Sequence, residues 1–173
     1  MGKDSITSEK KLTYEGLFDF VTTYSYIKSY LEDFKHYDVT EKELEEKSKG
    51  GKKEIKGNYT AELEFNDYYT LHMTFELKMA GKEVTIEDES GTHNLVEGTA
   101  SIVINTYLET GGMGQRPKGP LAEFLDKVYS KYIADEKKEA IIRLSKDTSE
   151  FLAKFKQTLN FKAKWKQKKE LRN

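Results

Sequence analysis

The most conspicuous candidate for binding chemistry is a glycine-rich segment that follows the last expected strand. Its members are Gly111, Gly112, Met113, Gly114, Gln115, Arg116 and Lys118. Glycines let backbone amides approach a phosphate, and Arg116 and Lys118 would add positive charge. However, the segment lacks the Gly-Lys-Ser/Thr ending of a P-loop and follows an antiparallel strand. We therefore favour an assembly arm that contacts a neighbouring subunit over a nucleotide site.

Histidines and glutamates are the other residues that could support catalysis. The histidines are far apart in the sequence, without metal-ligand spacing: His36, His72 and His93. We expect His72 to face solvent opposite Glu62, on a face shared with Glu64 and Glu76. Paired carboxylates can serve as acid and base, but such chemistry needs one of them in an apolar pocket. We therefore predict no catalytic, cofactor-binding or metal-binding residue, and a protein that is not an enzyme.

A basic segment closes the sequence. Residues 162–173 carry a net charge of +5, so the rest of the chain carries −6 within a total of −1. Its cations alternate with an aromatic residue: Lys162, Lys164, Trp165, Lys166, Lys168 and Lys169. This pattern could contact nucleic acid or an acidic surface, although it is also typical of a solubilising end. We predict one domain over residues 1–161 and a basic tail over residues 162–173.

Composition narrows the class of protein. The chain has 173 residues, of which 34% are charged and 12% aromatic, values that suit one folded domain with a highly solvated surface. The absence of cysteine excludes disulfides, thiolate zinc sites and cysteine nucleophiles. We see neither an apolar run of membrane-spanning length nor a signal-peptide pattern. The expected location is the cytoplasm, or a virus particle.

The clearest structural signal is a period-two alternation of apolar residues over residues 54–79. It predicts two long antiparallel strands with one buried face and one wet face. Because both strands bury odd-numbered residues, the connecting loop must have an odd length. A three-residue loop at residues 66–68 pairs Leu63 with Leu71 and Tyr59 with Phe75. The same register places Glu62 opposite His72.

Helical spacing dominates both ends of the chain. We expect residues 1–10 to be mobile, residues 11–16 to be extended, and residues 18–35 to form a helix capped by Asp19 that covers the hairpin. Its apolar stripe is Phe20, Tyr24, Ile27, Leu31 and Phe34. Two C-terminal helices are expected, one opening at Pro120 and the other over about residues 135–161. The first has the stripe Leu121, Phe124, Leu125, Val128 and Tyr132.

The remaining segments complete an α+β domain. Residues 37–47 suit either a charged edge strand or a short helix with a capping box, and we lean towards the strand. We expect turns at residues 80–81 and 88–91, and a short strand at residues 95–96 before the last long strand. The prediction is an antiparallel sheet of four to six strands packed against an N-terminal helix and C-terminal helices.

Two resemblances follow from these elements. The order helix, antiparallel sheet, long C-terminal helix resembles the helix-grip fold of the START and polyketide-cyclase superfamily, and this resemblance implies an apolar ligand between sheet and helix. The run Phe18, Asp19 and Phe20, together with residues 106–109 and 127–133, is similar to small uncharacterised α+β proteins of archaeal and tailed-phage genomes. That second resemblance implies no activity.

We expect a non-enzymatic structural or interaction subunit of a larger assembly, such as a virus particle or phage tail. Its partners would be other protein subunits in a homo- or hetero-oligomer, and the basic tail could add nucleic acid. The alternative is a helix-grip-like binder of a small apolar ligand. Under that alternative, the pocket would lie beneath Tyr59, Phe75 and Ile104.

Overall fold

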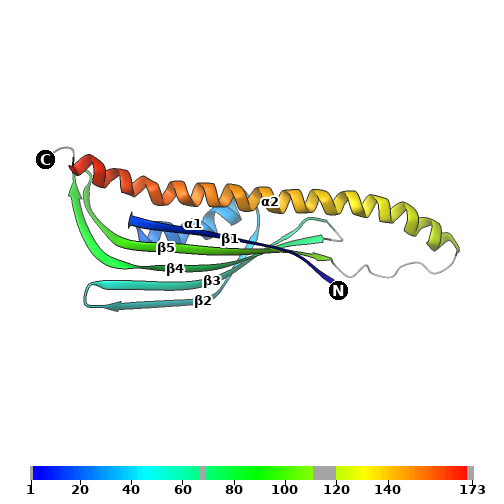
Figure 1. The fold of residues 1–173 in the computed structure, drawn as a ribbon, viewed down its shortest axis with the longest axis horizontal. Helices are drawn as coiled ribbons and strands as arrows, with labels where there is room; N and C mark the ends of the chain where they lie inside the picture. The colour runs from blue at the N-terminus through cyan, green and yellow to red at the C-terminus, as the bar shows by residue number, and fades with distance from the viewer. Residues whose placement is uncertain (1, 67–68, 111–119, 171–173) are drawn as a thin grey trace.

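The structure, a computed structural model, describes the backbone of residues 2–66, 69–110 and 120–170, and side chains within residues 9–159. The elements follow the order β1 (Gly2–Phe18), α1 (Phe20–Ser29), η1 (Tyr30–Phe34), β2 (Asp38–Lys49), β3 (Lys52–Glu64), β4 (Tyr69–Asp88), β5 (Gly91–Thr110) and α2 (Pro120–Glu170). The described strands form one antiparallel sheet in the order β1-β5-β4-β3-β2. Both helices lie on the same side of this curved sheet, and α2 runs along its length (Figure 1). The α+β prediction is therefore confirmed in outline.

The hairpin of β3 and β4 has the register that the apolar alternation predicts. Leu63 pairs with Leu71, Tyr59 with Phe75, and Glu62 with His72. At the tip, the Phe65 amide donates to the Tyr69 carbonyl at 2.9 Å. The register follows from the sequence because a shift of one residue would turn the apolar side chains to the wrong face. The preferred strand assignment for residues 37–47 is also confirmed, since these residues fall almost entirely within β2.

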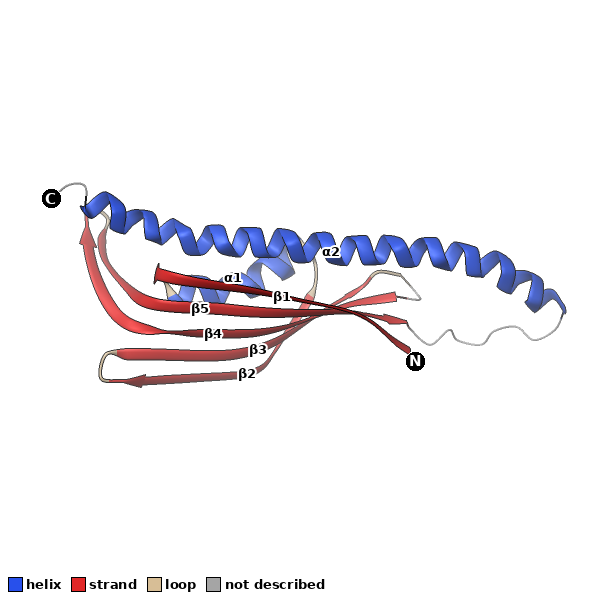
Figure 2. Ribbon diagram, in the orientation of Figure 1, coloured by secondary structure: helices blue, strands red, loops and turns tan. Residues whose placement is uncertain are grey.

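The expected turn at Ala80 and Gly81 is wrong, as is the expected break before the last strand. β4 and β5 instead continue without interruption, and Gly81 lies opposite Gly98 in their shared register. A Cβ atom added to Gly98 would lie 2.0 Å from the Ala80 carbonyl oxygen, so the two backbones approach closely here. Both long strands curve towards α2 at this end of the sheet (Figure 2). These two glycines therefore allow the backbones of β4 and β5 to approach closely, and they do not mark turns.

The beginning of the chain corrects another expectation. Residues 2–10, expected to be mobile, belong to β1 together with the segment expected to be extended. β1 pairs with β5 from Gly2 opposite Thr110 to Phe18 opposite Val96, with one irregularity between Asp4 and Ser8. The polar composition of this strand is compatible with its place at the edge of the sheet.

The N-terminal helix begins where the sequence predicts and then departs from the predicted periodicity. The Asp19 carboxylate caps α1 by accepting hydrogen bonds from the amides of Val21 and Thr22 at 3.0 and 3.4 Å. Residues Tyr30–Phe34 then form a π-helical turn, which rotates the stripe because it holds more residues per turn. Tyr30 is consequently buried, whereas Phe34 is 74% exposed.

The C-terminal region forms one helix of 51 residues instead of two. The residues around the expected break include good helix formers, and no proline or glycine interrupts residues 121–170. Phe151 of α2 is fully buried against Phe75 of β4, with ring centroids 5.2 Å apart. Phe151 also packs against Phe155, Tyr26 and Tyr30, so α2 and α1 share one aromatic core above the sheet.

Candidate functional sites

A cleft of about 290 Å³ lies between the helical segments α1 and η1 and the strands β2 and β3, which form one edge of the sheet. Its walls are Tyr24, Ser25, Lys28 and Ser29 from α1, Glu32 and Asp33 from η1, Val39 and Glu41 from β2, and Tyr59 from β3. Three carboxylates, two phenols and one lysine therefore surround one small space. Sequence reasoning missed this cleft because its residues come from four separate elements.

The phenols of the cleft have different partners. The Tyr24 hydroxyl donates a hydrogen bond to the Glu41 carboxylate at 2.5 Å, and this bond is the main reason why the pKa of Tyr24 is raised. Tyr59 is 3% exposed, and its enclosed hydroxyl interacts with the Tyr24 hydroxyl. Burial raises the pKa of Tyr59, and the hydrogen bond to Tyr24 and the charge of Glu41 raise it further. Tyr59, Tyr24 and Glu41 therefore form a short polar chain at the wall of the cleft.

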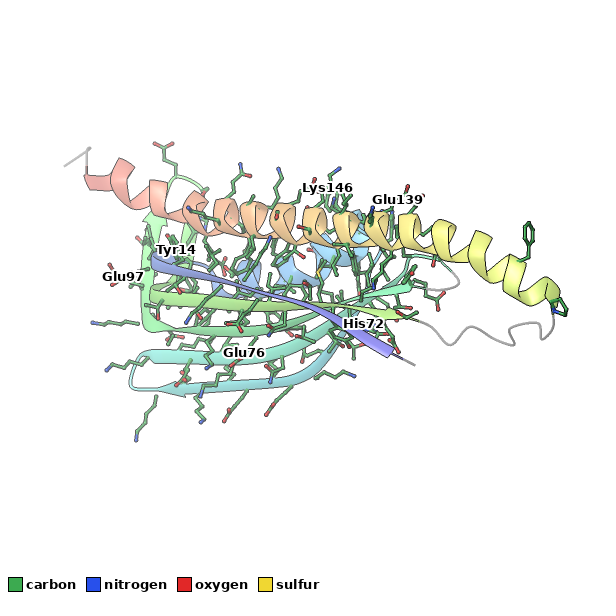
Figure 3. All side chains as sticks on the ribbon, turned by 45° about the vertical axis from the view of Figure 1, so that its right-hand side comes forward. Tyr14, His72, Glu76, Glu97, Glu139 and Lys146 are labelled. Carbon is green, nitrogen blue, oxygen red and sulfur yellow. The ribbon has the colours of Figure 1, made fainter. Side chains whose placement is uncertain are left out.

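His72 lies in a second polar cluster and corrects the expectation that it faces solvent. It is 5% exposed, and its ring stacks on Tyr107 of β5. Its Nε2 lies 2.5 Å from a Glu109 carboxylate oxygen, and its Nδ1 lies 3.5 Å from one of Glu62. The pairing of His72 with Glu62 was predicted. The Tyr107 ring that covers His72 comes from β5, so its position could not be inferred from the hairpin alone. Figure 3 shows His72 near one end of the sheet, far from Glu97 and Tyr14 at the other.

A buried carboxylate joins α2 to the segment after η1. Asp147, 1% exposed, accepts hydrogen bonds from the Tyr37 hydroxyl at 2.9 Å and from Arg143 Nε at 2.7 Å. Lys35 Nζ lies 3.4 Å from its other oxygen and also contacts Glu150. Burial and the facing carboxylate raise the pKa of Tyr37, while Asp147 raises the pKa of Arg143. Three polar partners, Tyr37, Arg143 and Lys35, therefore surround one buried carboxylate and tie α2 to the segment after η1.

The side of α2 that points away from the sheet carries two large exposed apolar side chains. Phe124 is 66% exposed and Ile142 is 65% exposed. They are 18 positions apart, about five helical turns, and therefore lie on one face roughly 27 Å apart. The buried Leu144 lies about 160° around the helix axis from Phe124. Glu139 and Lys146 also point away from the sheet (Figure 3). We refer to Phe124, Glu139, Ile142 and Lys146 as the outer face of α2.

Three lysines form a row across the sheet at the β2–β3 turn. Lys49 of β2 lies opposite Lys52 of β3, which lies opposite Lys82 of β4. The row borders an open groove of about 940 Å³. Like charges placed directly opposite in a sheet destabilise it. The C-terminal end of α2 lies at the same end of the molecule (Figure 1).

The residues predicted for binding are only partly covered by the structure. The arm, Gly111 to Lys118, lies outside the described residues. The backbone of α2 extends to Glu170 and so includes Lys162 to Lys169 of the basic tail, but these side chains are not described. Among the described residues, no group of three His, Asp or Glu side chains could hold a metal ion. Within the same part of the chain, no helix combines the length and apolarity needed to cross a membrane.

Comparisons with known proteins supply no family for this chain. No family model matches it, and no curated protein matches it. One solved structure that it matches is a protein of unknown function, SA2116, from Staphylococcus aureus. The two are 13% identical, the match covers 82% of this chain and 94% of the other, and the TM-score is 0.17. A score this low supports no argument about fold or function.

Proposed function

We propose that this protein is a non-enzymatic interaction protein that acts as a subunit of a larger assembly, and that it associates through the outer face of α2. The observation that carries this proposal is the pair Phe124 and Ile142, both about two-thirds exposed on one face of a long helix. These large side chains stand on a helix that packs on the sheet through Leu144 and Phe151, so contact with another protein would bury apolar area that is now exposed. The glycine-rich segment Gly111 to Lys118 immediately precedes this helix in the sequence, and we propose that it also contacts a neighbouring subunit.

The first partner that we propose is a second copy of this chain. The outer face carries both charge signs: Glu139 and Lys146 point away from the sheet (Figure 3), and they lie three positions before and four positions after Ile142 on the helix. A surface of mixed charge can be complementary to itself, as a twofold contact requires. Incorporation into a virus particle or phage tail is the setting that we propose for such a subunit.

Native mass spectrometry of the full chain tests this proposal. Ile142→Glu and Phe124→Glu place a charge on the outer face and should convert a defined oligomer into monomer. Val21→Glu is the matched control, because Val21 is 69% exposed on α1, away from this face. A unique thiol at Ser145→Cys, in a chain without cysteine, should cross-link two copies. If the chain remains monomeric at high concentration and binds no other protein from the organism that produces it, the proposal is wrong.

The helix-grip alternative, a binder of a small apolar ligand, has less support. Its pocket would lie beneath Tyr59, Phe75 and Ile104, all of which are buried. Phe151 of α2 already packs on Phe75. An apolar ligand there would have to displace a side chain of the protein's own core, at a cost similar to that of opening a cavity.

An acidic partner is a further candidate, favoured by the lysine row. If Lys49, Lys52 and Lys82 contact nucleic acid, binding should weaken steeply with salt concentration. Filter binding of single-stranded DNA to the full chain and to Lys52→Gln measures this effect. Salt-independent binding, or equal binding by the variant, would count against a role of this row.

A further inference from the structure

The strand β2 forms an open edge of the sheet. It is the last strand in the order of the described sheet, so no described strand pairs with its outer side. Figure 1 shows β2 on the side of the sheet away from α2. Its residues from Thr40 to Lys49 are all exposed. An edge strand presents a row of unpaired backbone N–H and C=O groups, which are a template for pairing with another chain.

Only part of this edge has the regular backbone that pairing needs. A β-bulge interrupts β2 between Glu41 and Glu43, where its register with β3 shifts. Such bulges discourage pairing at a sheet edge. From Glu43 to Lys49, however, the register with β3 is regular. Residues 43–49 are therefore the part of the edge that can accept another strand.

The charges of residues 43–49 follow an order that is complementary to itself. Four charged side chains share the wet face, because they pair with even-numbered residues of β3, whereas the buried residues of β3 are odd-numbered. In chain order they are Glu43, Glu45, Lys47 and Lys49. Antiparallel pairing of two copies with Glu46 opposite Glu46 places Glu43 against Lys49 and Glu45 against Lys47. Opposite charges directly across a strand pair stabilise it.

Other registers place like charges together. A shift of two residues in one direction sets Glu45 against Glu45, and the same shift in the other direction sets Lys47 against Lys47. Parallel pairing in register sets every charge against its own kind, which destabilises a strand pair. In the complementary register Glu46 faces its own copy, but Lys53 already lies 3.0 Å from each Glu46 carboxylate. The charge order therefore selects one antiparallel register.

We propose that two copies of this protein pair edge to edge through residues 43–49 of β2, about a twofold axis at Glu46, and so join their two sheets into one. Because this axis is perpendicular to the sheet, the helices of both copies lie on the same side. The contact is separate from the one proposed for α2, and the two together would link copies into an extended assembly. A contact this small is weak, with a dissociation constant of about 0.1 mM, so it forms at concentrations above those of native mass spectrometry.

Charge reversal tests this pairing by sedimentation equilibrium of the full chain at about 1 mM. Every chain carries Ile142→Glu, which removes the contact proposed for α2, so the two proposals can fail separately. One variant adds Glu43→Lys with Glu45→Lys, and the other adds Lys47→Glu with Lys49→Glu. All four positions are exposed, so both variants should fold.

Each variant alone should dimerise at least about tenfold more weakly than its parent, because every cross-strand pair becomes a pair of like charges. An equimolar mixture of the two variants should recover the affinity as a mixed dimer, because every pair is again of opposite charge. A parent chain that stays monomeric, variants with the affinity of the parent, or a mixture no tighter than either variant alone would overturn the proposal.

Disulfide cross-linking tests the register. The chain has no cysteine, so each introduced thiol is unique. A chain with Leu44→Cys should cross-link to a chain with Ser48→Cys, because the register sets these positions opposite each other and within the reach of a disulfide. Leu44→Cys alone is the matched control, since the same residue in two copies lies four positions out of register. Cross-linking in the control, or none in the mixture, would overturn the proposal.

Discussion

The imidazole of His72 lies flat against the ring of Tyr107, with centroids 4.4 Å apart and planes 4° apart. The two residues are register partners on β4 and β5. Nε2 of the ring lies at hydrogen-bonding distance from Glu109, and Nδ1 lies 3.5 Å from a carboxylate oxygen of Glu62. A residue that the sequence places on a wet face therefore forms part of a packed polar cluster.

His72→Ala should lower the free energy of unfolding by about 1 to 3 kcal/mol, because it removes the stacked ring and a hydrogen-bonded partner of Glu109. Urea denaturation measures the change. Lys78→Ala, an exposed residue on the same face of β4, should change stability by less than about 0.5 kcal/mol. Equal effects of the two substitutions would show that the stacked cluster contributes little.

Asp147→Ala should cost about 1 to 3 kcal/mol, because it leaves the buried Tyr37 hydroxyl without its acceptor. The matched comparison is Glu150→Gln, which removes an accessible carboxylate that pairs with the same Lys35. Exposed ion pairs contribute little, so this second variant should lose less than about 1 kcal/mol. Thermal and urea unfolding of both variants would reveal the contrast, and its absence would contradict the role of Asp147 in tying α2 to the segment after η1.

Tyr26, Tyr37 and Tyr59 should make the fold sensitive to alkali. Burial is the main cause that raises the pKa of each phenol above the ordinary value of 10.0. Folding therefore favours the neutral phenols. Their contribution is complete below pH 10 and is lost as the pH rises beyond it, because the unfolded chain ionises first. The urea midpoint should fall steeply from about pH 10 to 12.

The double variant Tyr26→Phe with Tyr59→Phe separates this effect from packing. The Tyr26 hydroxyl has no hydrogen-bond partner among the described residues, and the Tyr59 hydroxyl interacts with that of Tyr24, so the two substitutions should cost little stability at neutral pH. The decline of the urea midpoint above pH 10 should become shallower. An unchanged slope would mean that these phenols ionise equally in the folded and unfolded chains.

Gly98→Ala should destabilise the sheet by more than about 1 kcal/mol, because the added methyl group would overlap the Ala80 carbonyl and the Gly81 Cα atom. Thr99→Ala, at the exposed neighbouring position, serves as the control. Denaturation midpoints of the two variants should differ clearly. If Gly98→Ala is as stable as wild type, the close approach of β4 and β5 at this point is not needed.

Local patterns in the sequence determined the hairpin register, the Asp19 cap and the α+β class. The register follows from parity alone, because one-residue shifts reverse every side chain. The cap follows from one short carboxylate before an amphipathic run. Each of these features depends on residues that are close in the sequence, so each could be predicted without the rest of the chain.

Only the tertiary structure decided which residues cover each face. Gly81 and Gly98 resemble turn signals until their strands are paired, and His72 appears exposed until Tyr107 is placed beside it. The cleft around Tyr59 exists only where α1, η1, β2 and β3 meet. The physical reason is that periodicity shows which side of an element is apolar. Burial and close approach depend on which distant element packs there.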